Sequence, residues 1–222
     1  MPELYSVAID GPSGAGKSTL AKAAAAALGI CYVDTGAIYR TIGYGVYRRG
    51  IDPSDAGAVA AVLPDMQLEM RYDQAGLQRM MLAGEDVTDQ IRLPEMSRYA
   101  STVSAIPAVR DFLLELQREQ ARRHSVIMDG TVVLPDATVK IFLTAAPEVR
   151  AMRRFRELEQ RGTSQPYDQV LREIVDRDYA DTHRAIAPLR RAEDAVELDT
   201  GALTFEESLH LLLETIRRRA KL

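Results

Sequence analysis

The sequence predicts an α/β protein in which a parallel sheet of five strands carries helices on both faces. Two observations predict this class. Short, continuously apolar runs alternate with longer segments of helical periodicity, as in parallel sheets that are buried on both faces. Between residues 64 and 92 the rhythm changes to apolar–polar alternation, which is typical of half-exposed antiparallel strands. A small antiparallel insertion is therefore expected in addition.

The expected elements follow in chain order. The five strands of the parallel sheet are expected at residues 5–9, 30–33, 125–128, 139–143 and 195–198. Helices are expected between them, beginning near Lys17, Gly36, Pro107, Pro147, Tyr167 and Thr204. In the insertion, the segments "MQLEMRYD" and "GLQRMMLAGEDVT" predict two strands joined by a turn at residues 73–76.

Composition limits the class of protein. A chain of 222 residues is expected to form one domain, and its formal net charge of -4 argues against broad nucleic-acid binding. Cys31 is the only cysteine, and its place in "GICYVD" indicates a buried strand residue rather than a nucleophile. The N-terminus lacks signal-peptide features, and no apolar run approaches the roughly 20 residues that span a bilayer. We expect a cytoplasmic protein that binds neither nucleic acid nor membrane.

A phosphate-binding loop follows the first expected strand. The segment "GPSGAGKS" matches G-x-x-x-x-G-K-[ST] in full, between an apolar strand and an Ala-rich helix. Backbone amides of such a loop point at a polyphosphate, and the helix N-terminus adds positive potential. Lys17 is expected to reach the β and γ phosphates and Ser18 to ligate Mg²⁺. For Asp10, a structural role near the metal and a catalytic role both stay open. The expected ATP-binding residues are Gly11, Pro12, Ser13, Gly14, Ala15, Gly16, Lys17, Ser18 and Thr19.

The loop identifies the phosphoryl donor and leaves the reaction open. GTPases read guanine with Asn-Lys-x-Asp, and this sequence contains no asparagine. ATP-driven motors and synthetases are usually longer. A small chain with a phosphate loop and several clusters of arginines therefore fits a kinase for a small phosphorylated acceptor.

The stretch "DTGAIYR", residues 34–40, suggests where the acceptor binds. The second strand of such a sheet ends beside the phosphate loop, where an acceptor must lie for in-line transfer. Arg40, one helical turn from Gly36, would clamp the acceptor's phosphate, while Thr35 and Tyr39 would shape its pocket. In the simpler interpretation a strand ends here, Thr35 caps a helix and Arg40 is solvated.

With these residues in place, the sequence closely resembles the bacterial cytidylate kinases. "IDGPSGAGKST", "DTGAIYR", "LAGEDVTDQIR", "VVLPDATVKIFLTA" and "RAIAPL" fit that family in order and spacing, over nearly the whole chain. The resemblance implies a P-loop kinase fold and transfer of the γ-phosphate of ATP, with Mg²⁺, to CMP or dCMP. It also implies that the antiparallel insertion lies on the monophosphate side and that a helical lid is present.

The resemblance also implies roles for matching residues. Ser101 and Arg110 would face cytosine, and Arg177, Asp181 and Arg184 would meet the sugar and phosphate; the last three share one helix face by spacing. Arginines at positions 150, 153, 154, 156 and 161 resemble the lid over ATP, and of these we select Arg153 and Arg154 as charge-neutralising. Together with Lys17 and Asp129 they form the expected catalytic set. The single domain would comprise a core (1–63, 93–152 and 185–222), an insertion (64–92) and a lid (153–184).

The sequence departs from the family after Gly130. Where relatives carry D-G-R-D-[IM]-G-T, this chain passes from Gly130 directly to Thr131. The family's arginine there contacts the acceptor phosphate, and its aspartate pairs with cytosine. Two explanations stay open: the four residues are absent from the protein, or they are absent only from the chain as printed.

The alternatives to a cytidylate kinase are a related kinase with another acceptor, or an ATP-binding protein that lost transfer with this segment. A monomer is expected.

The departure gives a first prediction. If the four residues are absent, CMP turnover should be severely impaired and discrimination against UMP should relax. A carboxylate accepts from the amino group of cytosine, but facing the carbonyl of uracil it would be a buried acceptor without a donor. Inserting Arg-Asp-Ile-Gly between Gly130 and Thr131 should restore both rate and selectivity. CMP and UMP turnover of both forms, with masses verified, tests this. Full CMP selectivity in the short form would mean that another residue reads cytosine.

Overall fold

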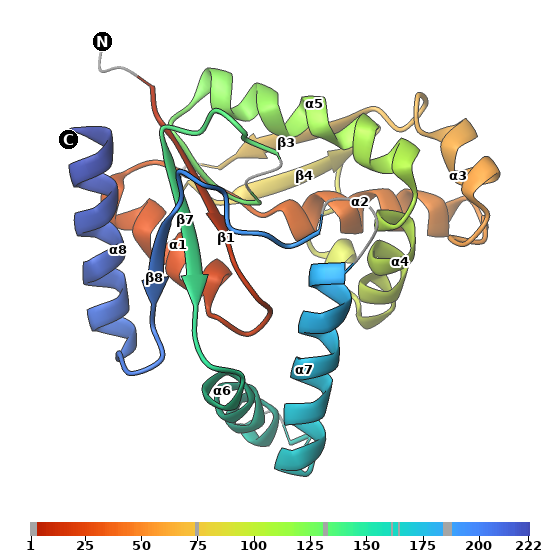
Figure 1. The fold of residues 1–222 in the computed structure, drawn as a ribbon. Coiled ribbons are helices and arrows are strands. Elements are labelled where there is room, and N and C mark those ends of the chain that lie inside the picture. The colour runs from red at the N-terminus through yellow and green to blue at the C-terminus, as the bar shows by residue number, and fades with distance from the viewer. Residues whose placement is uncertain (1–3, 74–75, 131–132, 161, 164, 184–187) are drawn as a thin grey trace. The chain divides into compact units, whose positions relative to one another are not determined.

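The computed structural model describes residues 4–73, 76–130, 133–160, 162–163, 165–183 and 188–222 (Figure 1). The chain divides into two compact units. The first comprises Met1–Ile30 and Ser125–Leu222, and the second comprises Cys31–His124. Among the described residues, none of the helices is both long and apolar enough to cross a membrane.

A five-stranded parallel sheet confirms the predicted fold class. Its strands are β1 (Ser6–Asp10), β2 (Cys31–Val33), β6 (Val126–Asp129), β7 (Val139–Thr144) and β8 (Val196–Asp199), in the order β2-β6-β1-β7-β8. Each strand begins within one residue of its predicted start. Strand β1 is central, with Ile9 opposite Asp129 of β6 and Asp10 opposite Phe142 of β7. Three consecutive residues of β1, Val7 to Ile9, are completely buried, as expected for a strand covered on both faces.

Four helices belong to the part of the first unit that the structure describes. They are α1 (Lys17–Leu28), α6 (Pro147–Gln160), α7 (Tyr167–His183) and α8 (Phe205–Ala220). Helix α1 packs beside α8 and against β6, while α6 and α7 pack on each other. Helix α8 starts with a capping box, in which Thr204 and Glu207 satisfy each other's backbone amides. Its predicted start near Thr204 is thereby confirmed.

The second unit holds the remaining elements. They are α2 (Thr35–Arg48), α3 (Ala56–Val62), β3 (Leu68–Tyr72), β4 (Gln78–Leu82), β5 (Glu85–Asp86), the short 3-10 helix η1 (Gln90–Arg92), α4 (Pro94–Ser104) and α5 (Pro107–Arg123). Strands β3, β4 and β5 form an antiparallel sheet, which confirms the predicted insertion and adds one short strand. Helices α3 and α4 were not predicted. Only one residue of α3 and two of α4 are buried, so each helix has few core-facing residues by which a sequence pattern could identify it.

Cys31 differs from its expected environment. It lies in β2 as predicted, but it is half-buried rather than buried. Burial raises the pKa of its thiol, and a hydrogen bond with Tyr72 offsets part of that effect. A raised pKa keeps the thiol protonated, which agrees with the prediction that it is no nucleophile.

Close packing of α2 on α4 generates a stability prediction. A β-carbon added at Gly43 would lie 2.9 Å from Cβ of Tyr99 and 3.1 Å from the backbone nitrogen of Ala100. Gly43→Ala should therefore force the two helices apart and destabilise the fold by about 1–3 kcal/mol. Gly57→Ala in α3 is the control, because a β-carbon there meets nothing nearer than 3.5 Å. Urea unfolding measures both variants, and equal stability of the two would show that this packing is not tight.

Candidate active site

The phosphate loop joins the central strand β1 to helix α1. Inside it, Nζ of Lys17 donates to the backbone carbonyls of Gly11, at 2.7 Å, and Pro12, at 2.9 Å. Burial lowers the pKa of Lys17 below its ordinary value, while the carboxylates of Asp129 and Asp10 act in the opposite direction. The lysine predicted to reach the phosphates thus lies within the loop itself, with its ammonium next to the backbone that would hold them.

Two carboxylates lie at the ends of neighbouring strands beside the loop. Asp10 ends β1 and Asp129 ends β6, and the register places Asp129 opposite Ile9. Oγ of Ser18 donates to Oδ2 of Asp129 over 3.3 Å. Oδ1 of Asp10 accepts from the backbone amide of Gly11 at 2.9 Å, so Asp10 has at least a structural role in the loop.

These oxygens suit a hard divalent cation. Ser18 and Asp129 offer a hydroxyl and a carboxylate within one hydrogen bond of each other, and Mg²⁺ in phosphoryl-transfer sites takes one or two protein oxygens together with phosphates and waters. The described residues contain no group of three or more His, Cys, Asp or Glu side chains that could hold a metal. A full protein cage is not needed for Mg²⁺ in such a site, so the donor set fits the predicted metal.

A pocket of about 640 Å³ opens above the loop, a size that accepts a nucleotide. The phosphate loop and the start of α1 form its floor, and Arg153, Arg154 and Arg177 of α6 and α7 contribute cationic side chains. The connection from β8 to α8 adds Leu203 and Phe205 on another side. Sequence reasoning did not select these two. The rule that ligands bind at the carboxyl ends of parallel strands would have indicated the segment after β8.

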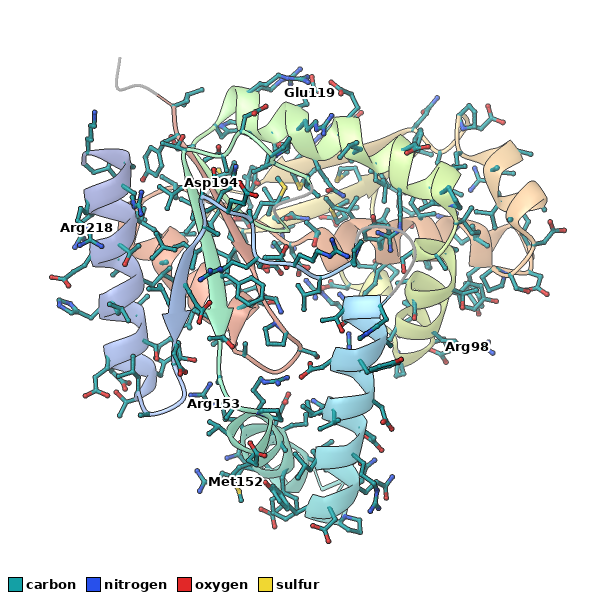
Figure 2. The ribbon with its side chains drawn as sticks, in the orientation of Figure 1. Arg98, Glu119, Met152, Arg153, Asp194 and Arg218 are labelled. Carbon is teal, nitrogen blue, oxygen red and sulfur yellow. The ribbon has the colours of Figure 1, made fainter. Side chains whose placement is uncertain are left out.

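The two selected lid arginines both line this pocket, with different contacts. Arg153 donates from Nη2 to the backbone carbonyl of Thr200, at 2.6 Å, and from Nη1 to its hydroxyl, at 3.3 Å. It therefore extends from α6 to the β8–α8 connection (Figure 2). Arg154 forms an exposed ion pair with Glu157 at 2.8 Å. Arg161, also in the arginine row, lies outside the described residues.

Within the second unit, Asp34 organises the predicted acceptor stretch. Its side chain accepts from the amide of Ala37 and caps α2, so the simpler interpretation of Thr35 as the cap is wrong: Thr35 is the first residue of the helix. The side chain of Gln78 bonds both the amide and the carbonyl of Asp34. Arg92 forms an ion pair with Oδ2 of Asp34 at 3.1 Å. Sequence reasoning missed Gln78 and Arg92, because their contacts with Asp34 are long-range.

Arg40 lies back along α2 toward its N-terminus. A β-carbon at Gly36 would lie 3.3 Å from Nη1 of Arg40. The guanidinium is therefore near the positive end of the helix dipole, where an anion is favoured. Tyr39 follows Ile38 in the same helix.

Ser101 and Arg110 come from α4 and α5 and approach each other through Ser104. Oγ of Ser104 donates to the carbonyl of Ser101 at 2.8 Å. Nε of Arg110 donates to the carbonyl of Ser104 at 2.6 Å. These bonds hold Arg110 against the end of α4, but they engage the backbone carbonyl of Ser101 and not its hydroxyl.

The predicted arginine–aspartate face of α7 belongs to the first unit. Arg177 and Asp181 face each other, with Nε and Oδ2 separated by 3.9 Å. The amide of Leu189 donates to the carbonyl of Asp181 at 2.8 Å. Arg184, the third member predicted for this face, lies outside the described residues.

A phosphate loop on the central strand of a parallel sheet, with cationic side chains around its pocket, defines a P-loop phosphotransferase. A family model described as cytidylate kinase matches residues 7–218. The chain belongs to the cytidylate kinase family. A cytidylate kinase of Caldicellulosiruptor bescii is 47% identical over 219 residues, with 97% of this chain and 96% of the relative covered. One of Mycobacterium leprae is 45% identical, with 96% of each covered.

The position of Lys17 leads to a direct test. Lys17→Ala should lower phosphoryl transfer on the order of 100-fold or more, because a preorganised donor is lost where charge develops on the phosphoryl group. The fold should persist, since Lys17 packs against its own loop. Steady-state turnover and thermal unfolding measure the two effects. Lys22→Ala, in the same helix, is the control; unchanged turnover in Lys17→Ala would show that the loop is not catalytic.

Proposed function

We propose that the chain transfers the γ-phosphoryl group of ATP to CMP or dCMP, giving ADP with CDP or dCDP. Membership of the cytidylate kinase family carries this proposal. The phosphate loop at the end of β1 and the pocket above it supply the donor site that this reaction needs. An oxygen of a nucleoside monophosphate is already a competent nucleophile, so catalysis rests on positioning and electrostatics rather than on a general base.

The donor side is assigned as follows. Backbone amides of the loop and the ammonium of Lys17 hold the β and γ phosphates, as the loop's conformation favours. Ser18 holds Mg²⁺, with Asp129 beside it; when bound, the ion neutralises charge on the phosphates. Arg153 and Arg154 line the pocket and are assigned to the charge that develops on the transferred group.

The acceptor residues are assigned from the family pattern, unit by unit. In the second unit, Arg40 holds the acceptor phosphate at the N-terminus of α2, Thr35 and Tyr39 shape the pocket, and Ser101 with Arg110 reads the base. In the first unit, Arg177 and Asp181 meet the sugar and phosphate, together with Arg184. The bond from Arg110 to the carbonyl of Ser104 holds its guanidinium at the end of α4, the helix that carries Ser101. We further propose one kinase domain, with an insertion at 64–92 and a lid at 153–184, acting as a cytoplasmic monomer without nucleic-acid partners.

One observation favours a second candidate function. The family's R-D-[IM]-G segment has no counterpart after Gly130, so an ATP-binding protein that has lost transfer is the alternative. Incubating the protein with Mg-ATP and CMP, and following ADP and CDP, separates the two. Equal formation of ADP and CDP supports the kinase. ATP binding with no product supports the alternative, and ADP formed with another monophosphate indicates a different acceptor.

The acceptor assignment yields a selective prediction. Arg40→Ala and Arg184→Ala should each raise the Michaelis constant for CMP far more than that for ATP, by roughly 10-fold or more, because a guanidinium fork binds phosphate in a charge-assisted, bidentate way. Arg48→Ala is the matched control, since Arg48 is paired with Glu85 at the far end of α2. Initial rates with each substrate varied in turn provide the measurement. A change mainly in the constant for ATP would make the assignment wrong.

A further inference from the structure

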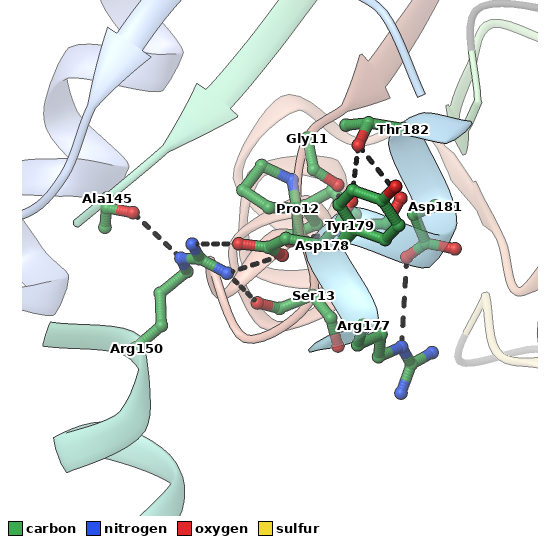
Figure 3. A network of polar contacts seen from close by, with 11 residues as sticks. Gly11, Pro12, Ser13, Ala145, Arg150, Arg177, Asp178, Tyr179, Asp181 and Thr182 are labelled. Carbon is green, nitrogen blue, oxygen red and sulfur yellow. Dashed lines mark hydrogen bonds and ion pairs between the residues drawn. The ribbon is translucent and has the colours of Figure 1, made fainter. Parts of the chain in front are cut away.

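Arg150 is a buried arginine whose guanidinium meets three parts of the first unit. Only 3% of the residue is exposed. From α6, its Nε donates to the carbonyl of Ala145 at 2.8 Å, and its Nη1 donates to the carbonyl of Ser13 in the phosphate loop at 3.0 Å. Both terminal nitrogens also pair with the carboxylate of Asp178 in α7, at 2.9 and 2.5 Å (Figure 3). One side chain thus ties together β7's end, the phosphate loop and α7.

The pairing with Asp178 is bidentate and mostly dry. Two parallel N–H···O bonds fix both the distance and the orientation of the partners. The side chain of Asp178 is 24% exposed and that of Arg150 is 3% exposed, so water screens this pair far less than a surface pair. Lysine has no planar fork and cannot reproduce the arrangement. The pair therefore fixes the side chain of Asp178 relative to the guanidinium that also bonds the loop.

Packing at Gly14 gives independent evidence for the same coupling. A β-carbon at this phosphate-loop glycine would lie 3.3 Å from Cβ of Arg150 and 3.4 Å from Cδ1 of Ile174 in α7. The loop therefore touches α6 and α7 directly, and not only through the guanidinium. Any shift of α7 must displace atoms that pack on the loop, because such interiors are close-packed.

Arg150 itself is not placed to bind a nucleotide. It is absent from the lining of the pocket above the loop, whereas Arg177, next to Asp178 in the chain, is part of that lining. The charges of Arg177 and Asp181 act on the pKa of Lys17 in opposite directions, after the larger effects of burial and of Asp129 and Asp10. This face of α7 is therefore electrostatically coupled to the phosphate loop, and Asp178 is the neighbouring residue that anchors it.

We propose that Arg150 is a positioning residue, which holds Arg177 over the phosphate loop through its ion pair with Asp178 and its hydrogen bond to Ser13. The inference rests on the proposed ATP-dependent transfer for its catalytic consequence. Its structural content is that Arg150 acts on ATP through Arg177. This adds a donor-side contact to the acceptor role that the family pattern gives Arg177, and it rests on the place of Arg177 in the lining of the pocket above the loop. Arg150 contacts neither substrate and takes no part in bond making.

A double-mutant cycle tests this proposal. The variants are Arg150→Lys, Arg177→Ala and the two combined, and the readouts are the Kd for Mg-ATP by calorimetry and kcat with CMP. Arg177→Ala alone should weaken ATP binding about 10-fold, as expected for loss of a charge-assisted contact. In the Arg150→Lys background, Arg177→Ala should weaken ATP binding by less than about 2-fold, because the effects of mutating residues that act as a unit do not add. Equal losses in both backgrounds would overturn the proposal and leave Arg150 a purely structural residue.

Further variants separate positioning from folding. Asp178→Asn removes the bidentate pair but leaves the bonds of Arg150 to Ala145 and Ser13. If Arg150→Lys fails to fold, Asp178→Asn takes its place in the cycle, and Arg177→Ala should again weaken ATP binding less in that background than in the natural chain. Asp176→Asn and Arg172→Lys, both exposed on α7, should bind ATP within about 2-fold of the natural chain. Thermal unfolding sets an assay temperature at which each variant is folded. If CMP is not phosphorylated, the proposed function fails while the cycle in Kd still decides the role of Arg150.

Discussion

The site depends on the central place of β1 in the parallel sheet. Because β1 lies between β6 and β7, the chain that leaves its carboxyl end emerges with neighbours on both sides and must turn directly into α1. That turn is the phosphate loop. Asp129 reaches the loop from β6, and Thr200 lies beyond the end of β8, so the donor pocket collects side chains that are distant in sequence. The sheet order thus decides which residues meet a nucleotide.

Backbone carbonyls hold cationic side chains that line this pocket or lie behind its wall. Lys17 donates to Gly11 and Pro12, Arg150 to Ser13 and Ala145, and Arg153 to Thr200. Carbonyl oxygens carry only partial charge, so they orient a cation without neutralising it. A carboxylate partner, as Asp178 provides for Arg150, compensates the charge as well. Arg150 is therefore buried, and a carboxylate compensates its charge. The hydrogen bonds of Lys17 and Arg153 to carbonyls orient these side chains and leave their positive charge available to a bound nucleotide.

Sequence alone predicted the fold and the loop well, because both depend on local patterns. Continuous apolar runs fixed the five strands to within a residue, and the spacing of Gly11, Gly16 and Lys17 identified the loop. Helices α3 and α4 were not predicted, because few of their residues are buried. The contacts of Arg92 and Gln78 with Asp34 were not predicted either, because local sequence patterns carry no information on contacts between residues that are 44 to 58 positions apart. The family pattern supplied the remaining site residues, whose roles stay predictions.

The row of arginines in α6 shows why composition alone misassigns such residues. Five arginines between positions 150 and 161 look equivalent in sequence, and helical spacing separates the four that lie in α6. Arg150 and Arg153 lie one turn apart on the inner side of α6, and they bond the phosphate loop and the β8–α8 connection, respectively. Arg154 is half-exposed and paired with Glu157 one turn later. Position on the helix, rather than charge, therefore determines that Arg150 and Arg153 support the pocket wall and that Arg154 remains at its edge. A half-exposed ion pair is weak, so Arg154 can change its rotamer at little energetic cost.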